Sequence, residues 1–533
     1  PSAAGVQNSI QYAYNYEVVP PYAGGCSNLG TLKPLVLVLH GHGGHKFRPA
    51  TVDDDPNWCD AFRIYPIDIS NSWWFGFAQD HDYRTGLPPT TGDTIENFTE
   101  QRLLRMVKDL LRHPVYGAQI DPERIFVTGH SMGATGTMSL AMRYPDVFAA
   151  AYASQPMTDH ESSVPSPQYD WVADATAKWG SPADNLPVAF GEVEGEDVHI
   201  APYAGTGVWD WQDHQANFTS RVADPMAPFG VTHGFLDTVL EFSTQGAPAF
   251  TAYEASRQSW AGTVENVMHV PTPHEGLPPT MGEDLNGLPF AGFSVVRSES
   301  VPAFSATDTN PPIPPTGPEQ YHYDVEWSAS WNDFDGAPID SLPLWGITLR
   351  SLDATTRTMD VTPRRLQSFR VQTGQLYSWQ NRRMSDGVLV DSGVVQGDAD
   401  ELCSVPQFEV SPGGNRLTLQ PVLVANAETI SVATGGSDQL DLVAGPDHAN
   451  KLYWVLGSVT GTTPGIPLGG GQTLPLNLDA YTQVTLSLPN SPLLANSLAI
   501  LDSEGEAAAA FTLPPGMDPG LAGVVLHHAY RSE

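Results

Sequence analysis

Residues 120–145, IDPERIFVTGHSMGATGTMSLAMRYP, decide the fold of this chain. The β-rich run at 124–128 predicts a strand, and the apolar spacing over 132–142 predicts a helix. Residues 129–133, GHSMG, lie between them and match the pattern G-x-S-x-G. A strand, tight turn and helix in this order lift a serine hydroxyl above the sheet at a helix amino terminus, where negative charge is favoured. The pattern also fits a tight turn without chemistry, but we predict Ser131 to be a nucleophile.

The flanking sequence alternates between strand and helix patterns. Residues 35–39, LVLVL, form a short apolar run that is typical of a strand buried on both faces of a parallel sheet. A long insertion covers residues 157–225. Strands are predicted at 11–19, 35–39, 62–66, 124–128, 148–152, 229–232 and 264–270, and helices at 99–112, 132–142 and 248–260. This alternation predicts an α/β fold with a doubly wound, mostly parallel sheet.

The pattern changes after about residue 300. Residues 310–318, NPPIPPTGP, predict a stiff linker, and the helical period is absent beyond them. Short β-rich runs between Gly, Pro and Asp turns predict β-sandwich-like domains. These predicted strands lie at 345–349, 368–371, 387–390, 439–443, 452–456 and 484–488. We therefore expect a catalytic domain over 1–305, a linker over 306–319, and accessory β domains over 320–424 and 425–533.

A second glycine-rich motif, HGHGG at residues 40–44, follows the buried strand at 35–39 directly. Such a loop can aim a backbone N–H at the point where an oxyanion forms. We predict that the N–H groups of His42 and Met132 form this oxyanion hole. An alternative for the same histidines is metal binding by His40, His42 and His45, but we expect no metal and no organic cofactor.

A serine nucleophile needs a histidine base and a carboxylate that orients the base. The predicted strand at 229–232 runs into HGFLDTV, which places Asp237 in the loop beyond the strand, with Asp197 as the competitor. The predicted strand at 264–270 is followed by PTPHEG, so His274 lies where a base belongs. His269 falls inside that predicted strand and is the second choice.

Two tryptophans, Trp73 and Trp74, lie in an aromatic run that could line a substrate cleft or pack in the core. Of the three cysteines, Cys26 and Cys59 are predicted to form a disulfide, leaving Cys403 free and buried. Acidic turns at 332–336 and 398–401 have calcium-ligand character, although solvated turns are expected there.

The charge balance restricts the partners of the chain. With 60 acidic and 25 basic residues, the net charge of the 533 residues is −35. Such a surface repels phosphate backbones and anionic lipid, so nucleic acid and membranes are not expected as partners, and the oligomeric state stays open. The charge and the small-residue start PSAAG predict a secreted protein whose targeting peptide has been removed.

Taken together, residues 120–145, the HGHGG loop and the later HGFLDTVLEFSTQG resemble the α/β-hydrolase esterases that include polyhydroxybutyrate depolymerases and feruloyl and acetylxylan esterases. The resemblance covers about 270 residues. It implies Ser131 as nucleophile, Asp237 as acid, His274 as base, and His42 and Met132 as oxyanion donors. The C-terminal regions resemble accessory β modules of extracellular bacterial enzymes.

The expected activity is hydrolysis of carboxylic esters through an acyl-enzyme. Polymer-linked esters are preferred, with plant-wall feruloyl or acetyl esters and aliphatic polyesters both open. A serine peptidase of the prolyl-oligopeptidase type is one alternative, although its β domain usually precedes the hydrolase. A binding or adhesion protein with an inactive hydrolase fold is the other.

Overall fold

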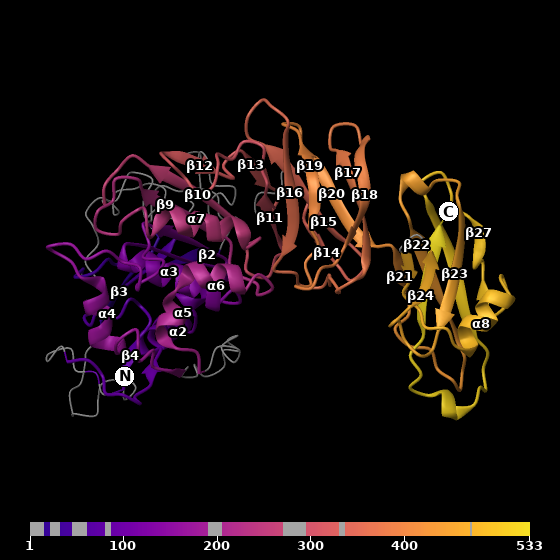
Figure 1. Ribbon diagram of the computed structural model, residues 1–533, viewed down its shortest axis with the longest axis horizontal. Helices are drawn as coiled ribbons and strands as arrows, with labels where there is room; N and C mark the ends of the chain where they lie inside the picture. The colour runs from indigo at the N-terminus through magenta and orange to yellow at the C-terminus, as the bar shows by residue number, and fades with distance from the viewer. Residues whose placement is uncertain are drawn as a thin grey trace. The chain divides into compact units, whose positions relative to one another are not determined.

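The computed structural model describes residues 15–21, 32–44, 61–79, 81, 87–189, 205–269, 295–329, 336–469 and 472–532 (Figure 1). The chain divides into two compact units. The first comprises Pro1–Pro338, Ile347–Gln367 and Pro406–Gly414, and the second comprises Ile339–Gly346, Ser368–Val405 and Asn415–Glu533. Within the described ranges, every helix is too short or too polar to span a bilayer.

An eight-stranded sheet forms the centre of the first unit. Its six inner strands pair in parallel, and the two edge strands run antiparallel to their neighbours. The order is β1 (Tyr16–Val19), β3 (Phe62–Pro66), β2 (Lys33–Leu39), β6 (Ile120–His130), β7 (Ala150–Ser154), β9 (Phe229–Gly234), β10 (Trp260–Glu265) and β12 (Glu319–Tyr321). The predicted α/β architecture with a mostly parallel sheet is confirmed.

Helices connect these strands. The fully buried helix α3 (Met132–Arg143) follows β6 and packs on β2, β6 and β7, because its apolar and small residues allow close approach on all sides. The others are α2 (Phe98–Leu111), α4 (Trp171–Trp179), α5 (Val208–Gln212), α6 (His214–Ser220) and α7 (Gly246–Ala255). The insertion contributes α4 to α6 and β8 (Val188–Ala189), which forms a small sheet with β4 (Phe77–Ala78) and β5 (Ile95–Glu96).

One pair of predicted elements is shifted. The helix predicted at 248–260 ends at Ala255, and the strand predicted at 264–270 begins at Trp260 and ends at Glu265. The Trp260 ring is buried and belongs to the strand, which pairs with β9 from Trp260↔Phe229 onward. The pattern WAGTVE has strand character, and counting Trp260 with the preceding helix displaced both boundaries.

Residues 306–319, predicted to be an interdomain linker, connect two sheets within the first unit. Before them, β11 (Val301–Ser305) pairs with β16 (Arg357–Arg364), which also pairs with β19 (Val405–Val410). After them, β12 returns to pair with β10. The expected boundary at 305 therefore differs from the observed pairing, because the chain leaves the hydrolase sheet before the proline-rich segment and rejoins it afterwards.

A six-stranded antiparallel sheet follows. Its order is β13 (Val325–Trp327), β15 (Trp345–Ser351), β20 (Asn415–Pro421), β17 (Leu376–Arg383) and β18 (Leu389–Gln396), with β14 (Ile339–Asp340) paired to β15. The strand predicted at 368–371 is absent from the described structure. Instead, Oδ1 of Asp340 accepts the N–H groups of Ser368 and Phe369, at 2.8 and 2.6 Å, so this segment is held as a loop.

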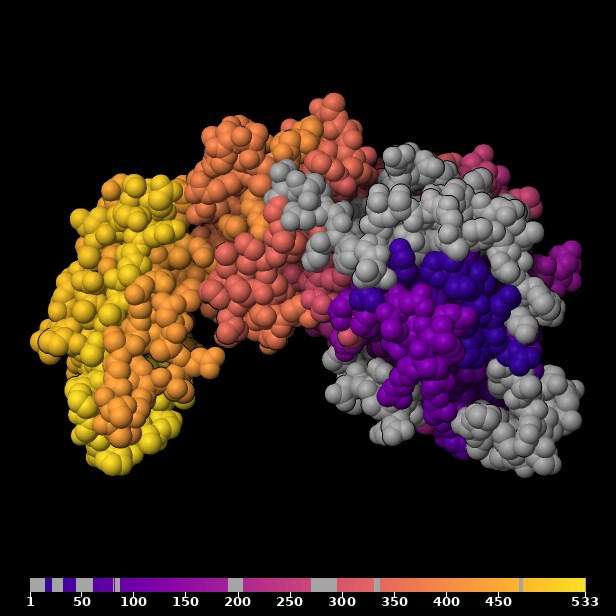
Figure 2. All heavy atoms as spheres, turned by 180° about the vertical axis from the view of Figure 1, so that it is seen from behind, coloured from indigo at the N-terminus to yellow at the C-terminus, as the bar shows by residue number. Residues whose placement is uncertain are grey.

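The C-terminal part of the second unit contains two antiparallel sheets that share a core, with Leu440, Val455 and Phe511 at its centre. One sheet contains β21 (Leu423–Ala425), β22 (Gly436–Val443), β28 (Glu506–Leu513) and β26 (Leu494–Ala495), and the other β27 (Leu498–Ile500), β23 (Leu452–Ser458) and β29 (His527–Ser532). A hairpin, β24 (Ile466–Gly469) and β25 (Gln472–Leu474), completes the set. Figure 2 shows the orange and yellow segments of this part side by side.

The strand predicted at 484–488 is wrong, because these residues belong to helix α8 (Ala480–Ser487). A capping box begins the helix: Asp479 accepts the N–H of Thr482, whose side chain bonds back to the N–H of Asp479. This cap satisfies amide groups that the first helical turn leaves unpaired, and it outweighs the strand preference of the β-branched residues in AYTQVTLS.

Candidate active site

Ser131 occupies a strained turn between β6 and α3. Its φ of 59° and ψ of −123° are unfavourable for a residue with a side chain, and its N–H donates to the Ser154 carbonyl at 2.9 Å. The turn depends on its glycines. A Cβ at Gly129 would lie 2.4 Å from the carbonyl carbon of Gly133, and one at Gly133 would lie 2.1 Å from the Leu39 oxygen. The G-x-S-x-G spacing therefore reflects contacts that only glycine allows.

The imidazole of His269 joins Ser131 to a carboxylate. Its Nε2 lies 2.8 Å from Ser131 Oγ, and its Nδ1 lies 2.6 Å from Asp237 Oδ2. The His269 side chain is 12% exposed and that of Asp237 is 1% exposed, so the carboxylate is shielded while the imidazole reaches the surface. The three side chains form a Ser–His–Asp relay with hydrogen-bonding geometry throughout.

Backbone groups after β9 fix the carboxylate of Asp237. The Asp237 N–H donates to the Gly234 carbonyl, and its Oδ1 accepts the N–H groups of Val239 and Leu240 at 2.8 and 2.9 Å. One carboxylate oxygen thus anchors the side chain, and the other is left for His269.

The segment that carries His269 is tied to its neighbours beyond the end of β10. The Leu236 N–H donates to the Val267 carbonyl at 3.0 Å, and Gln155 Nε2 donates to the Met268 carbonyl at 3.1 Å. A Cβ at Gly234 would lie 2.7 Å from the Val267 oxygen, so this close approach also requires glycine. These contacts hold the loop so that the ring faces Ser131.

The structure corrects the predicted base. His269, the second choice, contacts Ser131, whereas His274 lies outside the described residues. The base does lie in the loop that follows the last parallel strand, as expected, but that strand was predicted too far along the chain. Strand β10 ends at Glu265, so His269 already lies in the loop after it. The structure places Asp237 beside the base as predicted, and its competitor Asp197 lies outside the described residues.

Two further histidines surround the relay. The His130 ring lies 4.9 Å from that of His269, and burial, with the neighbouring His269, lowers the pKa of His130 to about 3. Burial also lowers the pKa of His233, at the end of β9, to about 4. Both rings are therefore neutral at neutral pH, and they add no positive charge beside the imidazole of His269.

The HGHGG loop lies against Ser131. A Cβ at Gly41 would be 3.5 Å from Ser131 Cβ, so the backbone of the loop is next to the nucleophile. The His40 ring fixes the start of this loop, because its Nε2 accepts the Asp68 N–H at 2.9 Å and its Nδ1 donates to the Gly41 carbonyl at 2.7 Å. The Gly43 N–H donates to Asn71 Oδ1 at 2.8 Å. Both ring nitrogens of His40 are therefore engaged in hydrogen bonds to the backbone that hold the loop in place.

A carboxylate from the insertion fixes the side chain of His42. Asp174 of α4 accepts from His42 Nε2 at 3.3 Å, from Trp73 Nε1 at 2.9 Å and from Lys178 Nζ at 2.6 Å. Burial raises the pKa of Asp174, but the bonds from His42 and Lys178 outweigh it and hold that pKa well below its usual range. The role of Asp174 is not predictable from the sequence, because nothing in the sequence connects the insertion with the loop.

Trp73 and Trp74, the two tryptophans predicted to contact substrate, are buried and pack against residues around the HGHGG loop. Trp73 packs edge-on against His160 and Trp171, and Trp74 donates from Nε1 to the His40 carbonyl at 3.0 Å. Both side chains are 0% exposed, so neither presents a surface to a ligand. The alternative of core packing is the one that the structure favours.

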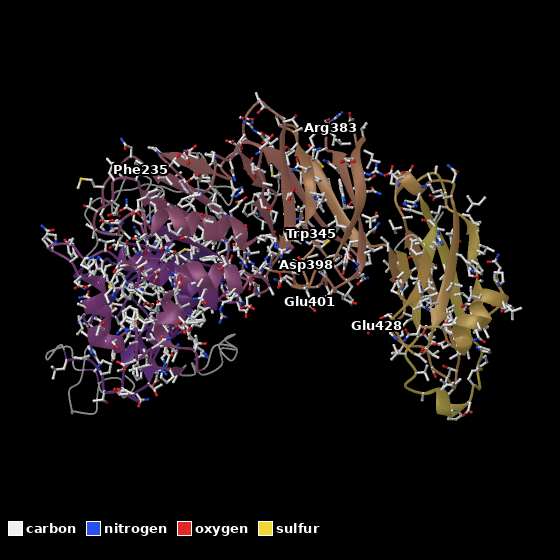
Figure 3. The ribbon with its side chains drawn as sticks, viewed as in Figure 1. Phe235, Trp345, Arg383, Asp398, Glu401 and Glu428 are labelled. Carbon is white, nitrogen blue, oxygen red and sulfur yellow. The ribbon has the colours of Figure 1, made fainter. Side chains whose placement is uncertain are left out.

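Other predicted site residues have structural partners or lie outside the described ranges. Among the described residues no group of three or more His, Cys, Asp or Glu could hold a metal ion. Asp398, labelled with Glu401 in Figure 3, accepts the N–H groups of Asp400 and Leu402 and closes a turn. Cys403 is free and buried, and Cys26 and Cys59 fall outside the described residues.

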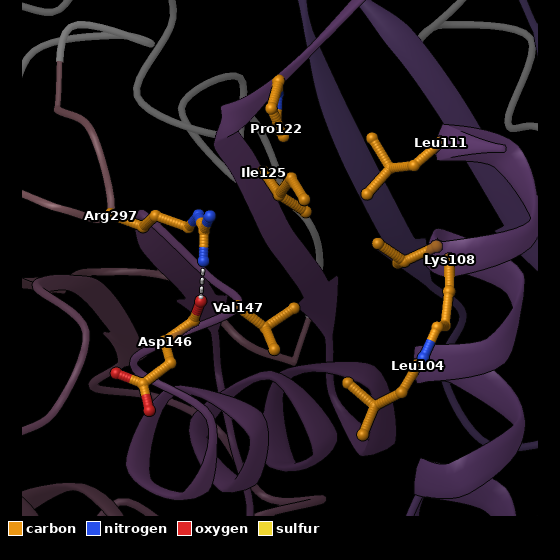
Figure 4. A pocket seen from close by; sticks show the side chains of 9 residues that line it. Leu104, Lys108, Leu111, Pro122, Ile125, Asp146, Val147 and Arg297 are labelled. Atoms are coloured by element: carbon orange, nitrogen blue, oxygen red, sulfur yellow. Dashed lines mark hydrogen bonds between the residues drawn. The ribbon is translucent and has the colours of Figure 1, made fainter. Parts of the chain in front are cut away.

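A pocket of about 140 Å³ in the first unit lies between α2 and the first half of β6 (Figure 4), whereas Ser131 follows the last residue of that strand. Leu104, Lys108 and Leu111 of α2 line it, together with Pro122 and Ile125 near the start of β6. Arg297 also borders it, but this guanidinium pairs with Glu123 and donates to the Asp146 carbonyl. The pocket is therefore no part of the Ser131 site.

Comparison with known proteins gives one family match. A model of the prolyl oligopeptidase family matches residues 107–190, a range that contains Ser131 and α4. No curated protein sequence matches the chain.

Solved structures resemble about half of the chain. An S-formylglutathione hydrolase from Agrobacterium tumefaciens is 16% identical, with 48% of this chain and 82% of that chain covered and a TM-score of 0.32. An acylaminoacyl peptidase from Pyrococcus horikoshii is 14% identical, with 50% of this chain and 37% of that chain covered and a TM-score of 0.32. An acetyl xylan esterase from Aspergillus awamori is 17% identical, with 49% of this chain and 90% of that chain covered and a TM-score of 0.27. The matched region spans little more than a third of the acylaminoacyl peptidase.

The family match, the strand order and the relay of three side chains agree on a class. The first unit has an α/β-hydrolase fold, and the chain is a serine hydrolase of that type.

Proposed function

We propose that this protein is a secreted serine esterase that cleaves carboxylic esters, preferably esters linked to a polymer. One observation carries the proposal: Ser131 Oγ lies 2.8 Å from His269 Nε2, whose other nitrogen lies 2.6 Å from Asp237. This arrangement activates a hydroxyl for attack on an acyl carbon.

In the first step His269 accepts the proton of Ser131 as the hydroxyl attacks the ester carbonyl. Asp237 stabilises the resulting imidazolium and keeps the reactive nitrogen directed at the serine. The N–H groups of Met132, at the start of α3, and of His42 stabilise the oxyanion. Loss of one such donor typically costs about 3 kcal/mol of transition-state stabilisation.

The protonated His269 then donates its proton to the departing alcohol, which leaves an acyl group on Ser131. In the second step the same imidazole removes a proton from water, which attacks the acyl-enzyme, and then returns that proton to Ser131 Oγ as the bond to the acyl group breaks and the acid leaves. Each group in this cycle is a side chain or amide of the chain itself.

Peptide hydrolysis is the second candidate, because the family model that matches residues 107–190 is that of prolyl oligopeptidases. The same relay serves both reactions, so the acyl substrate must decide between them. The preference for esters rests on the resemblance of residues 120–145 to polymer-ester hydrolases and on β domains that follow the hydrolase domain.

The test compares a p-nitrophenyl ester series with N-blocked aminoacyl p-nitroanilides. We expect ester hydrolysis to dominate in kcat/KM, and Ser131→Ala to lower it at least 1,000-fold while circular dichroism stays unchanged. Dominant hydrolysis of the anilides would assign a peptidase. Activity that survives Ser131→Ala would reject the site.

Polymer-linked substrates fit a catalytic domain that carries further antiparallel sheets, which we propose to be accessory β-sandwich domains. Assays of acid release from acetylated xylan, feruloylated arabinoxylan and polyhydroxybutyrate particles distinguish the substrate classes. The rival function, a binding protein with an inactive hydrolase fold, predicts no covalent labelling by a fluorophosphonate probe. Labelling of the wild type but not of Ser131→Ala would exclude it.

A further inference from the structure

One sheet of the second unit carries apolar side chains on its outward face. Along β23 the side chains alternate: Tyr453 and Val455 enter the core between the sheets, while Leu452, Trp454 and Leu456 point the other way. In a two-sheet domain the outward face is usually polar, because it meets water. These outward residues therefore need another explanation.

The strand register extends this face across all three strands. Trp454 pairs with Leu498 of β27 on one side and with Arg531 of β29 on the other, and Leu452 pairs with Ile500. Directly paired residues project to the same face, so Leu498, Trp454 and Arg531 form one row. Leu452 is 45% exposed and Ile500 is 64% exposed, so the apolar face is partly open.

The hairpin β24–β25 and helix α8 cover only part of this face and leave a cavity of about 250 Å³. Leu468, Leu474 and Leu486 from these elements face the row on β23 and β27. The volume is just below the roughly 300 Å³ at which sites for drug-sized ligands begin, so it suits a single short chain.

The polar groups of the cavity select its ligand. Arg531 is the one charged residue in its lining, and its guanidinium forms no ion pair with any of the described residues. The Trp454 Nε1 is buried and has no hydrogen-bond partner in the described structure. On a chain with net charge −35, an unpaired cation beside a buried donor and six leucines favours a ligand with one anionic end and an apolar body.

We propose that this cavity binds a short unbranched aliphatic carboxylate, with the carboxylate on Arg531 and the Trp454 N–H, and the alkyl chain against the Trp454 ring and the leucines. A carboxylic acid is also what ester hydrolysis releases, but the binding site itself does not depend on the proposed activity. It lies in the second unit and uses none of the residues of the Ser131 relay.

The test is titration of the full-length protein with hexanoate and octanoate by calorimetry, with hexan-1-ol and octan-1-ol as uncharged analogues. Each added methylene that becomes buried should tighten binding about four-fold. Octanoate should bind more tightly than octan-1-ol, and added salt should reduce that difference. Prior labelling of Ser131 with a fluorophosphonate should leave the titration unchanged.

Arg531→Gln should abolish the preference for the acid over the alcohol while the alcohol still binds, and Arg531→Glu should weaken octanoate binding further. Both changes are at an exposed side chain, so folding should be retained, and thermal unfolding checks this. Arg383→Gln, at a surface cation on β17 that pairs with Asp386, is the matched control and should bind octanoate like the wild type (Figure 3).

The inference fails if neither octanoate nor octan-1-ol binds, or if both bind equally to the wild type. It also fails if Arg531→Gln binds octanoate as the wild type does, because the ligand then lies elsewhere. Loss of binding on labelling Ser131 would assign the acid to the catalytic site.

Discussion

At the scale of single residues, the base of the relay is the sharpest point to test. His269→Gln should lower kcat/KM for a p-nitrophenyl ester at least 1,000-fold, because no other imidazole in the described structure lies within hydrogen-bonding distance of Ser131 Oγ. Steady-state kinetics at neutral pH measure this. His274→Gln is the matched control and should retain most of the activity, whereas the reverse result would restore the assignment made from the sequence.

The sequence was sufficient for Ser131 and Asp237, because each is defined by a local pattern. The serine lies in a glycine turn between a strand and a helix, and the aspartate follows a strand by a few residues. His269 was misjudged because its identification depends on the end of β10, and strand ends are the least certain feature of a pattern. Asp174 could not be found, since only the tertiary fold brings it to His42.

At the scale of elements, helix α4 is expected to position the HGHGG loop through Asp174. Asp174→Asn removes the charge that holds the His42 ring, and we expect the backbone N–H of His42, the proposed oxyanion donor, to become less well positioned. We expect kcat to fall about 10- to 100-fold with little change in KM, because the oxyanion forms only in the transition state. Ester kinetics over a range of substrate concentrations separate the two constants.

Asp170→Ala is the control for this prediction. Asp170 caps the same helix by accepting the Ala173 N–H and does not contact His42. Its loss should lower the free energy of unfolding by about 1 kcal/mol and leave kcat near the wild-type value. If both variants lose kcat equally, α4 matters only as a structural element.

Elements with a single strong pattern were predictable from the sequence. Strand β3 and helix α3 lie where the apolar pattern predicted them, within one residue at each end. Helix α8 was mistaken for a strand because it contains the β-branched residues Thr482, Val484 and Thr485, and the cap at Asp479 favours the helix. The course of the chain from β11, which pairs with β16, to β12, which pairs with β10, was not predictable, because the local sequence does not show which strands pair.

At the scale of the whole molecule, buried neutral histidines should make the fold sensitive to acid. Burial lowers the pKa of His130 and His160 to about 3 and that of His233 to about 4, whereas unfolded histidine titrates near 6.5. Below pH 6.5 the unfolded chain therefore binds protons that the folded chain does not. The free energy of unfolding should fall as pH drops from 6.5 towards 4, by up to about 1.4 kcal/mol per pH unit for each such histidine.

Urea unfolding at several pH values between 7 and 4.5 measures this slope. His160→Gln should make it shallower, and His113→Gln, on the partly exposed turn after α2, is the matched control. A slope that stays the same in the His160 variant would show that this ring does not contribute.

The bond between Asp174 and His42 has a consequence for engineering and for divergence. Segments inserted into hydrolase domains are attractive to exchange when a new specificity is wanted, since they are far from the nucleophile in the sequence. Here that exchange would also remove Asp174, which holds the side chain of His42, the proposed oxyanion donor. A graft of this insertion should therefore carry a carboxylate for His42, or the chimera will bind new substrates and turn them over slowly.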